Sequence, residues 1–342
     1  LKLPVILGTF GLAVFAYVIG VGAGPSFFAA MKTGGRALGV VIGGPLVAAV
    51  GWRAIFAVQA PMCFVGFVVA LWLLPGTDRL RGVRFDVAGS ITLGVGAASL
   101  LAGISQGRAW GWSSLPTLAC FVIAVAALRL FVTIERRTAA PLVMLHWFRT
   151  RNFAFPMLSQ MLTNFAYMGG FILIPQVLGQ RGLGLSDATK GYLVISRPLA
   201  FSLIAPLAAL ATMRVGERVA GVVGALGVVL SMVLWATVGL DSSYAFIVLA
   251  TACSGIGLGI ASPALTSLMA NSVDEADLGV AGAMQQLMTQ LGAVMGSAVL
   301  ATVSVTATPT NLAPFHLAFV VGAVVATGGC VAATFVRSTP RT

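Results

Sequence analysis

The sequence predicts an all-α polytopic membrane protein, and its composition and its apolar runs both point to this fold class. Of its 342 residues, 58% are hydrophobic and only 8% are charged, too few to give a soluble domain of this size a polar surface. The net charge of +11 does not indicate nucleic-acid binding, because the basic residues lie in short connections between apolar runs. We therefore exclude an ordinary soluble domain and a nucleic-acid partner, and expect the chain to lie in a lipid bilayer.

Eleven apolar runs account for most of the chain. A helix of ~20 apolar residues at ~1.5 Å rise per residue crosses the ~30 Å hydrocarbon core, so we expect about eleven transmembrane helices. The second run is short for a span, since only 16 residues separate Arg36 from Arg53. The runs are 4–30, 37–51, 54–74, 86–106, 116–134, 153–178, 188–212, 219–240, 243–269, 279–304 and 315–336.

Successive connections between the apolar runs lie on alternate sides of the membrane, and the number of basic residues on each side predicts the orientation of the chain. Short cytoplasmic loops are enriched in Arg and Lys. One set of connections holds eleven bases and the opposite set holds four, so we expect the C-terminus to be cytoplasmic in a multi-pass plasma-membrane protein. The first set is Arg79, Arg81, Arg84, Arg136, Arg137, Arg149, Arg151, Arg214, Arg218, Arg337 and Arg341; the second is Arg53, Arg108, Arg181 and Lys190.

The longest connection, 135–152, combines apolar and basic side chains. Leu142, Val143, Leu145, Trp147 and Phe148 lie among arginines, a composition that suits a short helix in the membrane interface. We expect this segment to link two helical bundles.

A polar stripe runs along the segment 153–178. Gln160, Thr163, Asn164 and Tyr167 recur at i, i+3, i+4 and i+7, which places them on one helix face. Lipid cannot satisfy these groups, so the face looks into protein or water. Two interpretations follow: a cavity that binds a substrate, or hydrogen bonding between helices.

The run 279–304 carries a second polar face beside a small-residue motif. Gln286 and Gln290 share a face with Thr289 nearby, and we expect these three to face the stripe of 153–178 as further substrate-binding residues. Gly292 and Gly296, four residues apart, predict a close approach to another helix.

Arg197 lies within the apolar run 188–212, seven residues after Lys190 and directly before Pro198. A guanidinium at that depth needs a partner, a cavity or the interface. Arg197 is therefore a candidate for gating or charge coupling, and the alternative is that it snorkels to the outer interface. All nine carboxylates lie in connections or at span ends, and Asp86 at the start of a helix has the position of a cap.

The sequence contains no constellation for catalysis, no phosphate-binding Gly-x-x-x-x-Gly-Lys loop and no metal-ligand spacing. We therefore expect neither an enzyme nor a bound cofactor or metal. Residues 20–31, GVGAGPSFFAAM, are similar to 255–269, GIGLGIASPALTSLM, which indicates an internal repeat of the kind found in transporters. Shared glycine-rich composition is the other explanation.

Several stretches, in order, resemble one family. GGPLVAAVGWRAIFAVQAP at 43–61, LLPGTDRLRGVRFDVAGSITLGVGAASLLAGISQG, WGWSS and ERRTAAPLVMLHWFRTRNF are similar to drug:proton antiporters of the major facilitator superfamily, the fourteen-span EmrB/QacA type. The resemblance covers nearly the whole chain from about residue 20. It implies that Gly44 and Pro45 belong to the antiporter motif Gly-x-x-x-Gly-Pro-x-x-Gly-Gly, in which Val40, Ala48 and Ala49 replace the other glycines.

The resemblance implies a domain division. The chain begins at the family's fourth span, and the first three spans, with their membrane carboxylate, have no counterpart, which indicates a truncated or incompletely represented fourteen-span protein. We expect a remnant of the N-terminal bundle at 1–75, two additional linker spans at 76–140 and a C-terminal six-helix bundle at 141–342.

The resemblance implies efflux of small amphipathic drugs or toxic compounds in exchange for protons, by alternating access. Two alternatives stay open: export of a metabolite or self-made antibiotic on the same fold, or a truncated membrane protein that does not transport. The sequence leaves the oligomeric state undetermined.

Overall fold

The structure, a computed structural model, describes residues 53–73, 86–138, 145–179, 187–305 and 311–337. Every predicted run from the third onward is a helix there, whereas the first two runs, Gly44 and Pro45 lie outside the described residues. The helices are α3 (Arg53–Leu73), α4 (Val87–Trp110), α5 (Leu115–Glu135), α6 (Arg151–Leu178), α7 (Asp187–Val215), α8 (Glu217–Trp235), α9 (Tyr244–Ala270), α10 (Leu278–Val303) and α11 (Ala313–Thr334), with short 3₁₀ helices η1 (Leu145–Arg149) and η3 (Glu275–Asp277).

Within the described ranges, eight helices, α4 to α11, are long and apolar enough to cross a membrane. This confirms a polytopic all-helical membrane protein. The predicted total of about eleven spans includes segments outside the described residues and stays a prediction.

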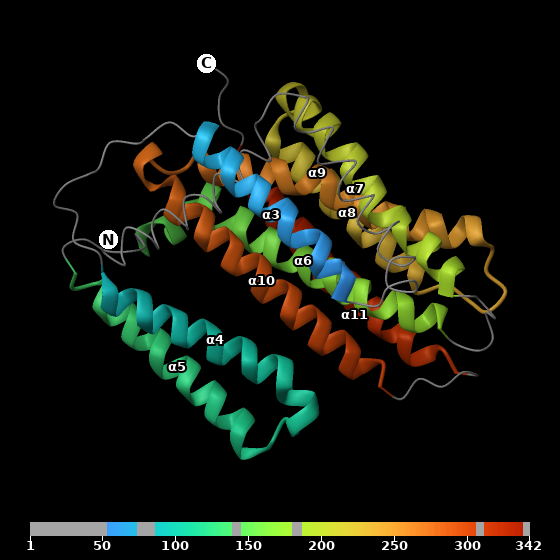
Figure 1. The fold of residues 1–342 in the computed structure, drawn as a ribbon, viewed down its shortest axis with the longest axis horizontal. Helices are drawn as coiled ribbons and strands as arrows, with labels where there is room; N and C mark the ends of the chain where they lie inside the picture. Colours follow the sequence, from blue (N-terminus) through green and yellow to red (C-terminus); the bar gives the residue numbers. More distant parts are fainter. Residues whose placement is uncertain (1–52, 74–85, 139–144, 180–186, 306–310, 338–342) are drawn as a thin grey trace.

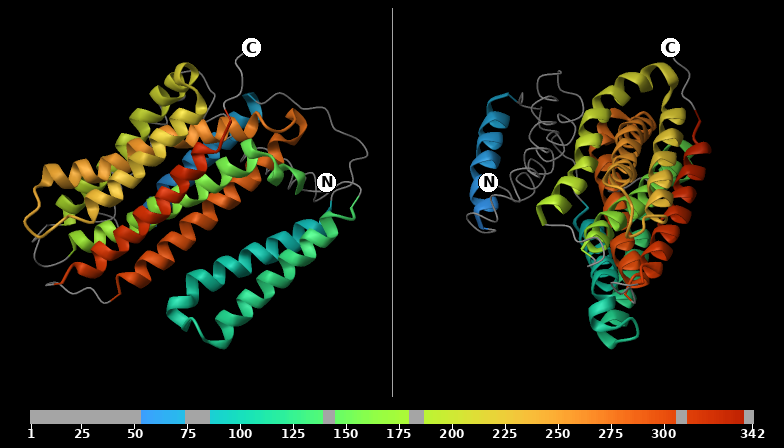
Figure 2. Two further views of the ribbon diagram at one scale, coloured as in Figure 1. Left: turned by 180° about the vertical axis from the view of Figure 1, so that it is seen from behind. Right: turned by 90° about the vertical axis from the view of Figure 1, so that its right-hand side faces the viewer.

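Helices α6 to α11 pack into one bundle (Figure 1). Helix α6 pairs with α10 and α11, α9 pairs with α7 and α8, and α8 also packs on α11. Helices α4 and α5 form a hairpin that touches the bundle mainly through α4 against α10, and in both views of Figure 2 it projects beyond the bundle.

Helices α6 and α10 approach each other at the predicted small-residue motif. A Cβ added to Gly292 would collide with the backbone carbonyl of Met161, and one added to Gly296 would collide with that of Phe165. The two helices therefore run in the same direction, backbone against backbone, as expected for small-x-x-x-small packing in membranes.

One end of the bundle carries the exposed Arg136, Arg149 and Arg151, and we call it the basic end. The backbone N–H of Arg337, just beyond α11, donates to Asn152 Oδ1 over 2.9 Å, so this end also holds the last described residue. The exposed Arg214 near the end of α7 lies at the same end, because α6 and α7 follow each other in opposite directions.

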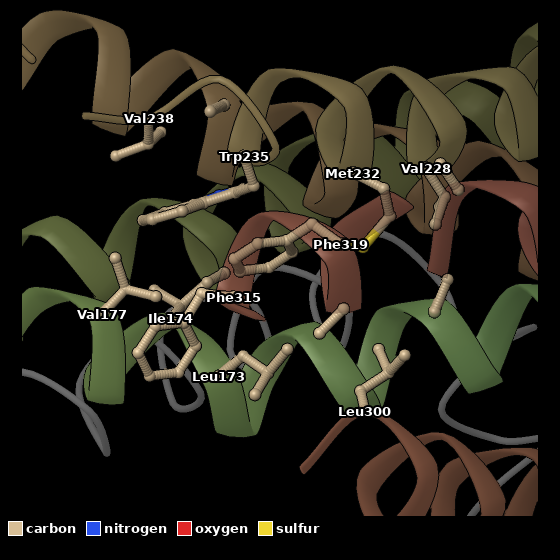
Figure 3. Close-up of a cluster of buried hydrophobic side chains, with 14 of the residues drawn as sticks. Leu173, Ile174, Val177, Val228, Met232, Trp235, Val238, Leu300, Phe315 and Phe319 are labelled. Carbon is tan, nitrogen blue, oxygen red and sulfur yellow. The ribbon is translucent and has the colours of Figure 1, made fainter. Parts of the chain in front are cut away.

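At the opposite end, the core is built around two aromatic rings. Trp235 of α8 stacks on Phe319 of α11 with ring centroids 5.5 Å apart, and both side chains are fully buried. Figure 3 shows the two rings side by side, with Leu173 and Ile174 of α6 next to them. This cluster joins α6, α8 and α11 in one apolar contact.

At the basic end, the described part of the connection before α6 is a short helix, and its predicted place at the membrane interface stays a prediction. Leu142 and Val143 lie outside the described residues. The described part contains the five-residue 3₁₀ helix η1, whose Trp147 is only 5% exposed. Trp147 lies 5.3 Å from the ring of Phe153 and shares a cluster with Phe131 of α5 and Met284 of α10. Through this cluster, η1 connects the α4–α5 hairpin to the bundle.

The start of α4 and the end of α8 show how local sequence sets the ends of helices. Asp86 caps α4, because its Oδ1 accepts from the N–H of Gly89 over 2.8 Å, which confirms the interpretation of this carboxylate as a cap. Helix α8 ends at Trp235 although the apolar run continues to 240. Val238, beyond the helix, is fully buried and packs in the aromatic cluster, so the extra apolar residues serve the core rather than the helix.

Candidate functional site

The polar stripe of α6 points into the bundle. Gln160, Thr163 and Asn164 are at most 4% exposed. Gln160 Nε2 donates to Ser262 Oγ of α9 over 3.4 Å, and Asn164 Nδ2 donates to the carbonyl of Gln160 over 3.0 Å. The stripe therefore lies between helices in this state, although Gln160 Oε1 and Thr163 Oγ1 have no hydrogen-bond partner among the described residues.

Helix α9 links this stripe to α10. Thr266 Oγ1 accepts from Gln285 Nε2 over 2.6 Å and itself donates to the carbonyl of Ser262 over 2.8 Å. Gln160, Ser262, Thr266 and Gln285 thus form a polar chain across three helices, which we call the α6–α9–α10 polar cluster. The sequence analysis did not select Ser262, Thr266 and Gln285, although the i, i+4 spacing of the first two could have indicated a shared face.

The other amides of α10 have different surroundings. Gln286 and Gln290 are exposed, and the hydroxyl of Thr289, which is half-buried, donates to the carbonyl of Gln285 over 2.9 Å. The structure therefore places Gln286 and Gln290 on an outward face of α10, apart from the buried stripe of α6.

Arg197 lies inside the protein. It is 1% exposed, and its guanidinium carbon is 3.4 Å from the centre of the Tyr167 ring and 5.4 Å from that of Phe171. Arg197 Nη2 also donates to the backbone carbonyl of Tyr167. A desolvated cation over an aromatic face gains about 2 kcal/mol or more, which offsets part of the cost of burying the charge.

The backbone of Arg197 is fixed by α9. A Cβ on Gly255 would collide with the carbonyl oxygen of Arg197, so α7 and α9 touch at this point without an intervening side chain. The Arg197 side chain therefore leaves α7 where that helix touches α9. It extends to α6, where it meets Tyr167, the fourth residue of the polar stripe. The sequence identified both Arg197 and Tyr167, but not their contact.

The remaining donors of Arg197 are unused. Within the described ranges, Nε and Nη1 have no hydrogen-bond partner, and the described carboxylates lie at helix ends or in connections. Leaving two N–H donors of a buried cation without acceptors costs several kcal/mol of free energy in general. An anion or polar group that reached these donors would therefore be bound strongly.

The chain matches the family model of the Major Facilitator Superfamily at residues 20–297 and 156–342. It is 31% identical to the tetracenomycin C resistance and export protein of Streptomyces glaucescens over 267 residues, which are 77% of this chain and 49% of that protein. It is 27% identical to multidrug resistance protein Stp of Mycobacterium tuberculosis, covering 79% of this chain and 50% of Stp.

A third relative, the methylenomycin A resistance protein of Streptomyces coelicolor, is 26% identical over 78% of this chain and 56% of its own length. The chain spans about half the length of the curated relatives it matches. The family model covers most of the sequence, and its helical membrane architecture agrees with the eight candidate spans. The chain belongs to the Major Facilitator Superfamily.

Proposed function

We propose that this chain takes part in transmembrane efflux of amphipathic drugs or toxic compounds by proton-coupled antiport with alternating access. The proposal is supported by the membership of the superfamily and by relatives named for tetracenomycin C, methylenomycin A and multidrug resistance. No enzymatic step is part of it, since a carrier works by binding its cargo differently in two conformations.

The observation that carries the proposal is the buried guanidinium of Arg197, whose Nε and Nη1 have no hydrogen-bond partner among the described residues. Among the described residues, the Tyr167 ring and carbonyl and the more distant Phe171 ring compensate for its burial. A conformation in which a carboxylate or a polar cargo reaches the two donors is favoured by that contact. Arg197 thus acts as a charge-coupling residue whose partner differs between the two states of the cycle.

The polar residues of α6 and α10 supply the substrate-binding surface in this proposal. Gln286 and Gln290, with Thr289, present amides and a hydroxyl on the outer face of α10. Among the described residues, Gln160 Oε1 and Thr163 Oγ1 have no hydrogen-bond partner. Asn164 and Tyr167 lie on the same face of α6. Amides and aromatic rings within an apolar surface suit amphipathic compounds better than sugars, which need more hydrogen-bonding groups.

The proposed architecture has about eleven spans, a C-terminus on the cytoplasmic side of the plasma membrane and the division 1–75, 76–140 and 141–342. The packing of α6 to α11 into one bundle supports the last unit, and the gathering of arginines at the basic end supports the orientation. Gly44 and Pro45 take the place of the antiporter motif.

A second candidate is export of a metabolite or self-made antibiotic. The Streptomyces glaucescens relative is named a tetracenomycin C resistance and export protein, and this name favours export of a self-made antibiotic. The two candidates differ in breadth: a drug exporter accepts several unrelated amphipathic dyes, whereas a dedicated exporter accepts one scaffold.

The test uses the full-length protein reconstituted in liposomes with an imposed pH gradient and a panel of fluorescent amphipathic compounds. We expect accumulation that stops when nigericin collapses the gradient. Accumulation that is indifferent to nigericin would contradict proton coupling, and a response to only one scaffold would select the dedicated exporter.

A further inference from the structure

An apolar crevice lies between the α4–α5 hairpin and α10. Its volume is about 300 Å³, and every side chain that lines it is apolar. From Leu93 to Leu100, it follows α4 for about 10 Å at ~1.5 Å per residue. Its lining also includes Ala97 of α4, Val132 of α5, Phe148 of η1 and Leu291 of α10.

Two arginines lie near the basic end of the crevice. Arg136 lies one helical turn beyond Val132, and Arg149 directly follows Phe148. Both arginine side chains are exposed, as is that of Phe148, which contributes to the crevice from its basic end. Cationic groups therefore stand where the apolar lining ends.

The two carboxylates at this end of the hairpin, Asp86 and Glu135, both lie against Gly89. Glu135 is 4% exposed, and its Oε2 lies 3.1 Å from where a Cβ of Gly89 would be, inside the hairpin. Asp86 is engaged with the N–H of Gly89. Within the described ranges, no ion pair joins Arg136 or Arg149 to the exposed carboxylates of the α9–α10 connection.

We infer that this crevice is a binding site for an anionic phospholipid. The phosphate binds Arg136 and Arg149, because guanidinium groups match phosphate oxygens in geometry and charge. One acyl chain extends past Phe148 between α4 and α10 as far as Leu100 and Leu291. Basic pockets between membrane helices are suited to acidic headgroups, and here the two arginines follow the end of an apolar lining.

The bound lipid has a structural consequence. The hairpin touches the six-helix bundle mainly through α4 against α10, so a chain in the crevice adds contact on the side that is otherwise open. Anionic lipid therefore holds the hairpin against the bundle. This inference concerns a site away from Arg197 and does not depend on the proposed transport.

The experiment is a native mass spectrometry titration of the full-length protein in neutral detergent. Three probes are compared: dioleoyl phosphatidylglycerol, dioleoyl phosphatidylcholine and glycerol phosphate without acyl chains. We expect saturable binding of phosphatidylglycerol alone. Equal binding of the two lipids would overturn the site, because the arginines would then have no role, and binding of glycerol phosphate would show a phosphate site without a lipid chain.

Two variants separate the charge from the crevice. The double variant R136Q/R149Q should bind phosphatidylglycerol at least about tenfold more weakly, as removal of two surface cations predicts. The matched variant R218Q/R337Q removes two exposed cations elsewhere at the basic end and should bind like the wild type. Equal losses in both double variants would attribute the binding to overall charge and overturn the inference.

A third variant, Ala97→Phe, fills the crevice and leaves the arginines in place. It should lose chain-dependent binding while keeping the melting temperature of the lipid-free wild type. If it binds phosphatidylglycerol as the wild type does, the acyl chain is not in the crevice. The arginine variants are at the surface and keep the proposal testable even if Ala97→Phe folds poorly.

Discussion

The guanidinium carbon of Arg197 on α7 lies 3.4 Å from the centre of the Tyr167 ring on α6, and the same guanidinium donates to the Tyr167 carbonyl. Helices α6 and α7 share few other contacts, whereas both pack on α9. This pair is therefore a direct polar connection between two helices that are otherwise joined through a third.

The charge of Arg197 should be needed for export. We expect Arg197→Gln to lower the initial rate of export at least about tenfold, the equivalent of ~1.4 kcal/mol, because the neutral amide loses the interactions proposed to differ between states. Arg129→Gln, which neutralises an exposed arginine of α5, is the matched control and should keep most of the activity. Transport by liposomes that contain equal amounts of each protein measures the difference. Equal rates for both variants would remove Arg197 from the coupling scheme.

The contact of α6 with α10 should not tolerate a side chain at Gly296. Gly296→Leu places four carbons against the carbonyl of Phe165, and overpacking of this kind costs about 1–3 kcal/mol or more. We expect a lower melting temperature in detergent. Gly279→Leu is the control on the same helix, because a Cβ there has open space, and it should leave the melting temperature unchanged. A seam that accepts leucine at Gly296 would mean that the helices are farther apart than described.

The two kinds of amide on α10 should behave differently. Gln285→Leu removes the donor to Thr266 and should lower stability by about 0.6 to 1.7 kcal/mol, the range measured for hydrogen bonds between membrane helices. Gln286→Leu changes an exposed position, and we expect unchanged stability with reduced export. Thermal unfolding and transport are measured on the same preparations. Loss of stability in Gln286→Leu would show that its amide is a packing group instead of a substrate contact.

The aromatic core should depend on ring volume more than on the indole N–H. Trp235 is fully buried, and its Nε1 has no hydrogen-bond partner among the described residues. Trp235→Ala should cost about 3–5 kcal/mol, whereas Trp235→Phe should cost much less, because it leaves no orphaned donor. Trp110→Ala, at a position that is 47% exposed, serves as the control and should have a small effect. The melting temperatures of the three variants give the order directly.

The sequence predicted the helices well because each needs a certain length of apolar residues to cross a bilayer. The predicted run 153–178 and the helix Arg151–Leu178, for example, differ by two residues. The prediction was less accurate where an apolar residue serves another purpose: Val238 extends the run of α8 but packs in the core beyond the helix end. Apolarity alone does not distinguish these two roles.

The candidate site was predictable only in part. Spacing placed Gln160, Thr163, Asn164 and Tyr167 on one face of α6, but it could not show which helix covers that face. Ser262 of α9 bonds to Gln160, and Gly329 of α11 lies against Thr163. Both lie about 100 residues or more away in the sequence, and the packing of α9 and α11 on α6 brings them there. For the same reason, Arg197 and Tyr167 were selected separately, since the rotation of α7 about its axis decides where a side chain points.

The most direct test of the account is a double-mutant cycle on Arg197 and Tyr167 with export rate as the readout. The cycle compares the wild type, Arg197→Gln, Tyr167→Leu and the double variant, all at equal protein density in liposomes. We predict a coupling energy of about 1–2 kcal/mol, so that the double variant is hardly worse than Arg197→Gln alone, because the ring acts on the guanidinium. Additive losses would contradict the account, since the two side chains would then act independently and the contact across α6 and α7 would have no part in transport.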